Sequence, residues 1–538
     1  MSSVISIAAA VFVGLLPVDQ ADSATDRARV IAAQSARVET IQRLVPSVAC
    51  LFNKGDQAGG GSGVLIDKDG YGLTNFHVVA GMLRDRQGDA GLAGKRLVDM
   101  EILGIDPGGD VAMFRIDPKE RFNPAPLGDS DGLAVGDYTL AMGNPFGLAD
   151  DYAPTVTHGI ISGLHRFQAG VRGALTYTDC IQVDTSINPG NSGGPLFDMS
   201  GRLIGINGRI AVEERNRVNV GVGFAISINQ IKRFMPMLRA GIVTPHATAG
   251  FTVRDQALRV LVDEIEDRGA VRTAGLQHGD ELIRFAGRNI HSANDFLNIL
   301  GTLPADWPVE VAFRRDGEVR RFNMRLAAMP LPKLTRDAPN QPKLAFDPYG
   351  PHPVTTKANR RAVCRAIELF HKAAGSSNVW HDGIGLVAGG TRTPTGAHEE
   401  KGETISWRVR ASSDDSKAED AIPDTVEATI WSELLSMSAD KPAKGLRVVA
   451  SNEVRGRICV VIERKLEKGQ PQRLSFDDET GELLAVEFTH AGTGIVFRYE
   501  YGSVQSVGAM RMPRARWVYR GETLFAEDSF TEMAIEAR

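Results

Sequence analysis

The stretch Asn188–Leu196 reads Asn-Pro-Gly-Asn-Ser-Gly-Gly-Pro-Leu, and it is the most informative segment of the chain. Glycines before and after Ser192 predict a tight turn on which backbone N–H groups converge. Acyl transfer needs such donors where negative charge develops on a carbonyl oxygen. The stretch therefore indicates a serine that acts as a nucleophile.

Two upstream stretches supply the groups that such a serine requires. Leu73–Gly81 reads Leu-Thr-Asn-Phe-His-Val-Val-Ala-Gly, and Gly109–Met113 reads Gly-Asp-Val-Ala-Met. A histidine accepts a hydroxyl proton near neutral pH, and a carboxylate fixes its tautomer and stabilises the imidazolium. His77, Asp110 and Ser192 follow the chain order of the chymotrypsin arrangement, which differs from the orders of subtilisin and the α/β-hydrolases.

The pattern around these stretches is mainly β. Between residues 48 and 228, short strand-like runs alternate with turns every ~8–12 residues, which is typical of a barrel or sandwich. A second unit, 247–326, has strand-like runs at 260–264, 281–285 and 309–314 and a helix-like run at 293–300. A proline-rich stretch follows, then a predicted helix at 359–374 and a series of alternating strands to the C-terminus.

The serine, histidine and aspartate stretches resemble those of the trypsin-like serine proteases of the HtrA (Deg) type. The resemblance runs in order over about residues 45–240 and includes Gly61–Val64, Gly143–Leu148, Thr157–Ser162, Gly205–Asn207 and Gly223–Ile226. It implies that His77 is the general base, Asp110 its orienting group and Ser192 the nucleophile. It also implies an oxyanion hole made by the backbone N–H groups of Gly190 and Ser192. The alternative is a decayed protease used as a binding module.

The same resemblance places Ser186 at the base of the specificity pocket, six residues before the nucleophile. Ser186 is not acidic, which disfavours cleavage after Lys or Arg. Ile187 and Ile210 are expected to narrow the pocket, so we predict cleavage after small or medium aliphatic residues. Arg209 departs from the small or neutral residue expected beside the pocket.

The second unit resembles a PDZ domain of the HtrA type, over about residues 247–328. The match is strongest at Ala274–Ile283, which reads Ala-Gly-Leu-Gln-His-Gly-Asp-Glu-Leu-Ile. PDZ domains bind an extended C-terminus as an added strand, and side-chain pockets give specificity. Ala249, Gly250 and Phe251 match the loop expected to receive the terminal carboxylate. The alternative is a spacer domain that binds no peptide.

The C-terminal region resembles in pattern the half-barrel of periplasmic lipoprotein-carrier proteins, with no diagnostic motif. A curved sheet can shelter an apolar ligand or a partner segment, and the alternative is a structural or docking domain. His371, His381 and His398 lack tight ligand spacing with Cys or acids, so no metal site and no cofactor are expected. The sequence does not decide whether Cys364 and Cys459 form a disulfide.

Composition limits the remaining function classes. The 538 residues carry a net charge of -5 and only four Cys, which excludes a nucleic-acid-binding basic field and a disulfide scaffold. The apolar run Val4–Val18 is too short for a comfortable membrane span, and it suits a signal peptide despite the absence of a preceding Lys or Arg. We therefore expect a periplasmic or secreted protein, with a cytoplasmic location as the alternative.

The predicted fold class is mainly β and multidomain: a chymotrypsin-like double β-barrel, a PDZ domain, and a helix with an antiparallel half-barrel. The expected segments are a signal peptide at 1–24, a helical segment at 25–46, a protease domain at 47–240, a PDZ domain at 247–328, a proline-rich linker at 329–355 and a C-terminal α+β domain at 356–538.

The predicted function is a serine endopeptidase that cleaves unfolded or damaged proteins and uses its PDZ domain to bind substrate or to regulate cleavage. Its expected partners are unfolded protein or peptide substrates and C-terminal peptides, with a possible homotrimer that the resemblance suggests. The main alternative is a chaperone or scaffold, and a third is a lipid or lipoprotein carrier with an attached protease.

Overall fold

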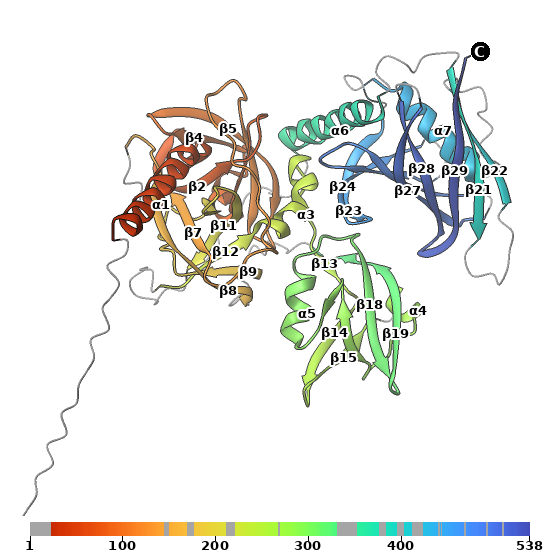
Figure 1. Ribbon diagram of the computed structural model, residues 1–538, viewed down its shortest axis with the longest axis horizontal. Helices are drawn as coiled ribbons and strands as arrows, with labels where there is room; N and C mark the ends of the chain where they lie inside the picture. The colour runs from red at the N-terminus through yellow and green to blue at the C-terminus, as the bar shows by residue number, and fades with distance from the viewer. Residues whose placement is uncertain are drawn as a thin grey trace, which may run out of the picture.

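The computed structural model describes residues 23–144, 150–168, 177–210, 221–266, 270–330, 352–375, 384–394, 403–410, 423–438, 442, 444–466, 470–490, 493–507 and 510–537. Most of the expected signal peptide and of the expected linker lies outside these residues. Helix α1 (Ser23–Leu44) leads into the first barrel through a short turn of 3₁₀ helix, η1 (Val45–Ser47). Figure 1 shows the two barrels at the left, the large C-terminal sheet at the upper right, and a smaller sheet below and between them.

The first barrel has six antiparallel strands and closes in the order β1-β2-β3-β6-β5-β4. Its strands are β1 (Val48–Asn53), β2 (Asp56–Leu65), β3 (Tyr71–Thr74), β4 (Gln87–Leu92), β5 (Arg96–Asp106) and β6 (Val111–Ile116). Helix α2 (Phe76–Val79) and 3₁₀ helix η2 (Ala80–Met82) follow β3. Strands β1 and β3 are almost continuously buried, as expected where both faces of a strand are covered.

The second barrel repeats this architecture and closes in the order β10-β11-β12-β9-β8-β7. Its strands are β7 (Tyr138–Gly143), β8 (Thr155–Gln168), β9 (Tyr177–Val183), β10 (Pro195–Asp198), β11 (Leu203–Ile210) and β12 (Gly223–Ser227), and helix α3 (Ile228–Arg239) follows. Two six-stranded closed barrels in sequence confirm the predicted chymotrypsin-like fold.

A PDZ-like sheet follows α3, with the strand order β14-β15-β16-β18-β19. Its main elements are β14 (Phe251–Gln256), β15 (Arg259–Ile265), β16 (Glu281–Phe285), β18 (Pro308–Arg315), β19 (Glu318–Arg325), α4 (Ala270–Thr273) and α5 (Ala293–Leu300). The short strands are β13 (Ala247–Thr248), which pairs with β20 (Ala327–Ala328), and β17 (Arg288–Asn289), which pairs with β16. Ser292 and Asp295 form a capping box that fixes where α5 begins.

The C-terminal unit is a nine-stranded antiparallel sheet with two helices. Its elements are α6 (Pro353–Ala374), β21 (Ile384–Pro394), β22 (Glu403–Arg410), α7 (Pro423–Ser436), β23 (Leu446–Val454), β24 (Arg457–Arg464), β25 (Gln472–Asp477), β26 (Leu483–Thr489), β27 (Val496–Val507), β28 (Met510–Arg520) and β29 (Thr523–Ala537). Phe370 of α6 and Trp431 of α7 share one hydrophobic core with the sheet, so both helices cover the same face.

Helix α7 departs from the expectation of strands alone after residue 404. Its apolar residues Ile430, Trp431 and Leu434 are buried against the sheet, but the buried position one turn earlier is Glu427. The carboxylate of Glu427 accepts hydrogen bonds from Arg516 at 2.7 Å and from the hydroxyl of Tyr501. A charge on the buried face interrupts the 3.6-residue apolar period, which is the signal for an amphipathic helix.

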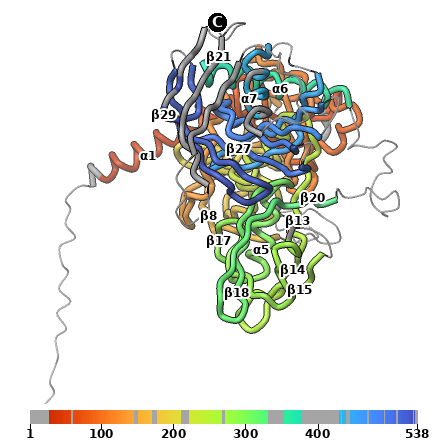
Figure 2. The backbone as a smooth tube through the Cα atoms, turned by 90° about the vertical axis from the view of Figure 1, so that its right-hand side faces the viewer, coloured from red at the N-terminus to blue at the C-terminus, as the bar shows by residue number. Residues whose placement is uncertain are grey.

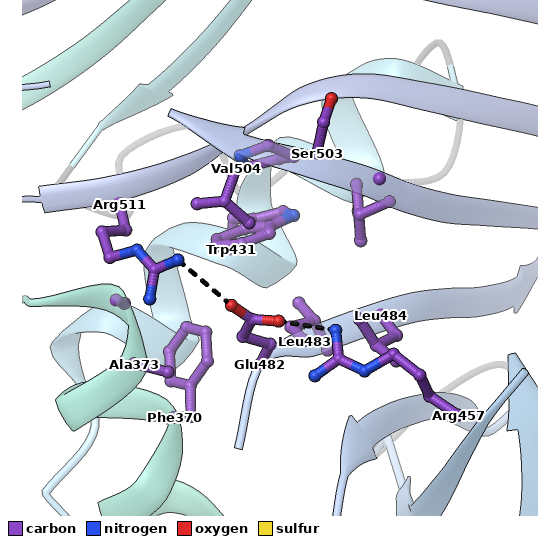
Figure 3. Close-up of a pocket in the computed structure, with 14 residues that line it drawn as sticks. Phe370, Ala373, Trp431, Arg457, Glu482, Leu483, Leu484, Ser503, Val504 and Arg511 are labelled. Atoms are coloured by element: carbon purple, nitrogen blue, oxygen red, sulfur yellow. Dashed lines mark hydrogen bonds and ion pairs between the residues drawn. The ribbon is translucent and has the colours of Figure 1, made fainter. Parts of the chain in front are cut away.

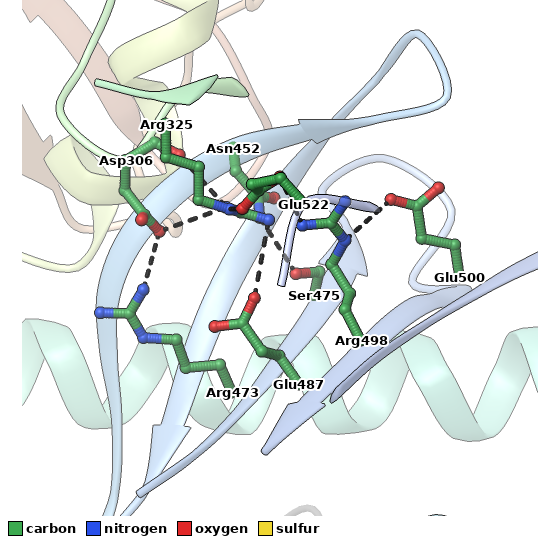
Figure 4. Close-up of polar contacts among 9 residues, drawn as sticks. All are labelled: Asp306, Arg325, Asn452, Arg473, Ser475, Glu487, Arg498, Glu500 and Glu522. Atoms are coloured by element: carbon green, nitrogen blue, oxygen red, sulfur yellow. Dashed lines mark hydrogen bonds and ion pairs between the residues drawn. The ribbon is translucent and has the colours of Figure 1, made fainter. Parts of the chain in front are cut away.

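The C-terminal unit contacts the PDZ-like unit through a network of charges (Figure 4). Arg325, at the end of β19, reaches Glu522 at 3.1 Å and Glu487 at 3.7 Å. Arg473 reaches back from β25 to Asp306 of the PDZ-like unit at 2.9 Å. In Figure 2 the PDZ-like unit lies below the C-terminal unit, and β20 lies near their junction.

The C-terminal unit also contacts the double barrel. Arg239, at the end of α3, lies 2.6 Å from Asp478, and Arg361 of α6 lies 3.1 Å from Glu101 of β5. Ala358 of α6 packs into the core of the barrels. The three units therefore contact one another in this structure.

None of the described helices is long and apolar enough to cross a membrane.

Candidate functional site

His77 and Asp110, far apart in the sequence, meet in the first barrel. Asn75 is the N-cap residue of α2, which carries His77, and Asp110 directly precedes β6. The imidazole Nδ1 lies 3.0 Å from Asp110 Oδ1 and 2.8 Å from Oδ2, and the backbone N–H of His77 donates to Oδ1 at 3.0 Å. The buried carboxylate therefore fixes both the ring and the backbone of His77.

The backbone of Asp110 is in the left-handed region, with φ +56°. A non-glycine residue in this region is strained and needs its surroundings to hold it. The side chain of Asn75 and the backbone N–H of Phe76 both donate to the Asp110 carbonyl, at 3.0 and 3.2 Å. The turn is therefore constrained from the side of α2.

Tyr177, the first residue of β9, was not predicted as part of the site. Its buried hydroxyl donates a hydrogen bond to Asp110 Oδ2. A carboxylate removed from water needs such donors to remain charged. No signal in the sequence links the two residues, because they belong to different barrels.

The position of His77 suits exchange of protons with a substrate-bound group, since 43% of its side-chain surface is exposed. Burial of the ring lowers its pKa, but the hydrogen bond and charge of Asp110 outweigh this, and the net pKa is raised above the ordinary value. The imidazole therefore becomes the neutral base only when the pH exceeds this raised pKa.

The loop that carries Ser192 is held against the first barrel. Ser62 of β2 donates its backbone N–H to the carbonyl of Ser192 at 2.9 Å. Gly193 has φ +81°, and a Cβ built on it would lie 2.2 Å from Thr74 Oγ1. Only glycine fits at this close approach, which brings the serine loop beside the segment leading to His77.

The hydroxyl of Ser192 donates to the carbonyl of Gly208 at 3.3 Å, and within the described residues it has no hydrogen bond to His77. Catalytic hydrogen bonds are often long or misaligned before substrate binds. The backbone N–H groups of Gly190 and Ser192 donate to no acceptor in the described part of the chain.

Ser62 is a second residue that sequence reasoning did not assign. Its hydroxyl donates to the Gly190 carbonyl at 2.7 Å and accepts from the backbone N–H of Asn144 at 3.0 Å. It therefore orients the peptide that follows Gly190. The signal was present, because Ser62 lies in the Gly61–Val64 stretch, but a backbone contact cannot be read from a motif.

The predicted specificity residues are not all at a surface. Ser186 is exposed, and its carbonyl accepts from Thr157 Oγ1 at 2.8 Å. Ile187 is buried in the core of the second barrel, against Gly223. The side chain of Ile210 lies outside the described residues, although its backbone pairs with Gly223 in β12.

The predicted PDZ loop precedes an edge strand. Ala249 and Phe251 are buried, and Gly250 between them has φ +72°. Strand β14 pairs with β15 at one edge, and its Asp255 accepts from the backbone N–H of Ala293 at 2.8 Å, which places the start of α5 beside it. This strand and helix frame the position where an added peptide strand is expected.

The C-terminal unit contains a small pocket of about 60 Å³ between its two helices and the sheet (Figure 3). Phe370, Trp431 and Val504 form apolar walls, and Glu482 at the rim lies between Arg457 at 2.6 Å and Arg511 at 3.6 Å. A volume this small admits one side chain or a short apolar group, well below the several hundred Å³ of ordinary ligand pockets.

The cysteines are Cys50, Cys180, Cys364 and Cys459, and all four are free thiols. Burial raises the pKa of Cys50 to about 11, so this thiol is inert at neutral pH. Among the described residues, no group of three or more His, Cys, Asp or Glu side chains could hold a metal ion.

Comparisons with known proteins agree with this geometry. Residues 61–206 match the trypsin-like peptidase domain, and residues 248–326 match the PDZ domain. The periplasmic serine endoprotease DegP of Escherichia coli strain K12 is 34% identical over 300 residues, which cover 52% of this chain and 60% of DegP. The chloroplastic protease Do-like 1 of Arabidopsis thaliana is 35% identical over 291 residues, which cover 51% of this chain and 64% of that protein.

Among solved structures, the HtrA-type protease AlgW with a tripeptide is 30% identical, with a TM-score of 0.46. The match covers 55% of this chain and 98% of the AlgW chain. The chain thus spans somewhat under two thirds of these curated relatives. The C-terminal region lies beyond both matched domains and has no family assignment.

Proposed function

Because residues 61–326 of this chain are an HtrA/DegP-type trypsin-like peptidase domain followed by a PDZ domain, we propose that the protein is a serine endopeptidase of unfolded or damaged proteins. The observation that carries the proposal is the contact of His77 with the buried Asp110, together with the packing of the Ser192 loop against Ser62 and Thr74 of the first barrel. No cofactor takes part in this proposal.

In the proposed mechanism, neutral His77 accepts the proton of Ser192 Oγ while that oxygen attacks the scissile carbonyl. Rotation of the hydroxyl away from the Gly208 carbonyl precedes this step. The N–H groups of Gly190 and Ser192 stabilise the oxyanion, and Asp110 stabilises the imidazolium. His77 then protonates the leaving amine, and water hydrolyses the acyl-enzyme by the reverse use of the same groups.

The exposed Ser186 supports a proposal for substrate choice. With no acid at this position, we propose cleavage after small or medium aliphatic residues, with Ile210 beside the pocket. Ile187 is buried, so in this proposal it supports the pocket from beneath and does not contact the substrate. Cleavage mapping on a peptide library tests this, and dominant cleavage after Lys or Phe would contradict it.

For the PDZ-like unit we propose binding of C-terminal peptides beside β14, with Ala249, Gly250 and Phe251 as the carboxylate loop. The edge position of β14 supports strand addition. The relatives named periplasmic support export of this chain after removal of residues 1–24, and assembly as a homotrimer also stays a proposal. The remaining proposed boundaries are 25–46, 47–240, 247–328, 329–355 and 356–538.

The second candidate is a chaperone or scaffold that holds partners without cleaving them. The 3.3 Å hydrogen bond of Ser192 to Gly208 favours it, because a serine in that rotamer is not poised for attack. Reduced, unfolded casein incubated with wild type and Ser192→Ala separates the two. Cleavage by wild type alone supports the peptidase, whereas casein left intact by both, also with hydrophobic C-terminal peptides added, supports the scaffold.

A further inference from the structure

A partly buried histidine outside the predicted triad, His246, lies where the barrels meet the PDZ-like unit, with 14% of its side-chain surface exposed. It lies between α3 and β13, and its ring packs against Phe234 of α3 in a tilted arrangement with centroids 4.7 Å apart. Its Nε2 lies 2.7 Å from Asp106 Oδ1, and its Nδ1 lies 3.0 Å from the carbonyl of Gly301. One ring thus bridges the first barrel and the end of α5.

The two contacts require both ring nitrogens to donate, because a carboxylate and a carbonyl oxygen only accept. A neutral imidazole carries one N–H and would leave a lone pair facing one of these oxygens. Burial of the ring lowers its pKa, but the charge and hydrogen bond of Asp106 outweigh this and the carbonyl of Gly301 adds to them, so the net pKa is raised. Asp106 is the charged group that faces the ring among the described residues.

Asp106 in turn holds the turn that presents Asp110. The same Oδ1 that contacts His246 accepts the backbone N–H of Gly109 at 2.9 Å. A Cβ built on Gly109 would lie 2.5 Å from Asp106 Oδ2, and one on Gly108 would lie 2.8 Å from the His246 ring. The two glycines are therefore needed for the ring and the carboxylate to lie against the turn.

This turn ends at Asp110, whose backbone is in the left-handed region at φ +56°. Such a conformation persists only where the surrounding contacts over-determine it. Asn75 and Phe76 hold Asp110 from one side, and the bond from Gly109 to Asp106 holds the preceding residue. Removal of the hydrogen bond between Gly109 and Asp106 leaves the turn free to relax toward an unstrained backbone.

We propose that Asp106 and His246 are positioning residues for Asp110, and that through Gly301 they couple the seating of the PDZ-like unit to the geometry of the His77–Asp110 pair. The inference rests on the proposed peptidase function for its effect on turnover. Its structural part, the support of the Asp110 turn, is independent of any activity.

The test uses the full chain with His246→Gln, Asp106→Asn and the double variant, compared with His165→Gln. His165 is the matched control, because its Nδ1 lies 2.8 Å from Asp179, which also contacts Arg288 of the PDZ-like unit at 3.1 Å, and no hydrogen bond of His165 among the described residues reaches the Asp110 turn. The measurements are kcat and KM on an unfolded protein across pH, hydrogen exchange of the peptide that spans residues 106–111, and thermal unfolding to verify folding.

We expect His246→Gln and Asp106→Asn each to lower kcat about tenfold or more at little change in KM, since a small misplacement of a catalytic group has effects of up to about 10²-fold. Both should displace the acidic limb of the pH profile, because that limb reports His77. The double variant should be no worse than the more impaired single variant. Exchange at 106–111 should rise in all three and stay unchanged in His165→Gln.

Two results would overturn the proposal. Exchange at 106–111 that matches wild type in His246→Gln would show that the turn does not depend on His246, whether or not the chain is a peptidase. Equal losses of kcat in His246→Gln and His165→Gln, with the acidic limb in place, would show a general effect of domain contact. If wild type lacks Ser192-dependent cleavage, the proposed function fails while the exchange data still decide the structural claim.

Discussion

Replacement of Tyr177 by Phe tests how far Asp110 depends on its donors. The change removes the hydroxyl that donates to Asp110 Oδ2 and keeps the ring, which packs against Gly208. Asp110 is fully buried, so water cannot replace the lost donor. A hydrogen bond to a charged group contributes about 1.5–3 kcal/mol, and we expect destabilisation of about 2 kcal/mol in the protease unit.

The same change should alter catalysis in a defined direction. With one donor lost, the negative charge of Asp110 is less neutralised and attracts the imidazolium of His77 more strongly. The pKa of His77, already raised by Asp110, should rise further, and the acidic limb of kcat/KM should move to higher pH. Turnover above that limb should fall about tenfold, as the carboxylate gains freedom to rotate.

The assay combines a pH profile of kcat/KM with thermal unfolding of the protease unit, for which 2 kcal/mol corresponds to roughly 4–8 °C. Tyr138→Phe is the matched control, because Tyr138 is largely exposed and stacks on His158. A Tyr177→Phe protein whose melting temperature and acidic limb coincide with those of Tyr138→Phe would refute the reasoning.

Three further changes have definite expected outcomes. Asp110→Asn should lower kcat by about 10⁴-fold in the casein assay, because an amide at this position stabilises the wrong tautomer of His77, while circular dichroism stays unchanged. Gly193→Ala should abolish cleavage and cost more than about 3 kcal/mol in urea unfolding, because the new Cβ would meet Thr74 Oγ1 at 2.2 Å. Arg325→Ala should remove the cation that faces Glu487 and Glu522 and weaken the contact between the PDZ-like and C-terminal units by about 1.5–3 kcal/mol. Limited proteolysis between the two units should then be faster. An unchanged rate of proteolysis would show that Arg325 does not stabilise this contact.

Elements with strong local signals could be predicted from the sequence. The helix at 293–300 has a capping box at Ser292, and the strand at 281–285 has clear turn signals at both ends. The predicted bounds of these elements match the observed ones. Helix α7 could not be predicted in the same way, because its buried Glu427 is satisfied by residues 74 and 89 positions away.

The residues of the candidate site also fall into those with a local signal in the sequence and those without one. His77 and Asp110 could be recognised because their stretches carry motifs, and the structure places them in contact. Tyr177 and His246 could not be recognised, since each acts through a contact with a distant part of the chain, 67 and 140 positions away. The roles of Ser192, Gly190 and the PDZ loop stay predictions that biochemistry must test.

The central claim is that Ser192 is a nucleophile activated by His77, and covalent labelling tests it most directly. The full chain is incubated with a fluorophosphonate that phosphonylates activated serines, and the modified residue is identified by peptide mass mapping. We predict one adduct, on Ser192, that forms far more slowly in His77→Ala. An unmodified Ser192, or labelling that does not depend on His77, would contradict this claim.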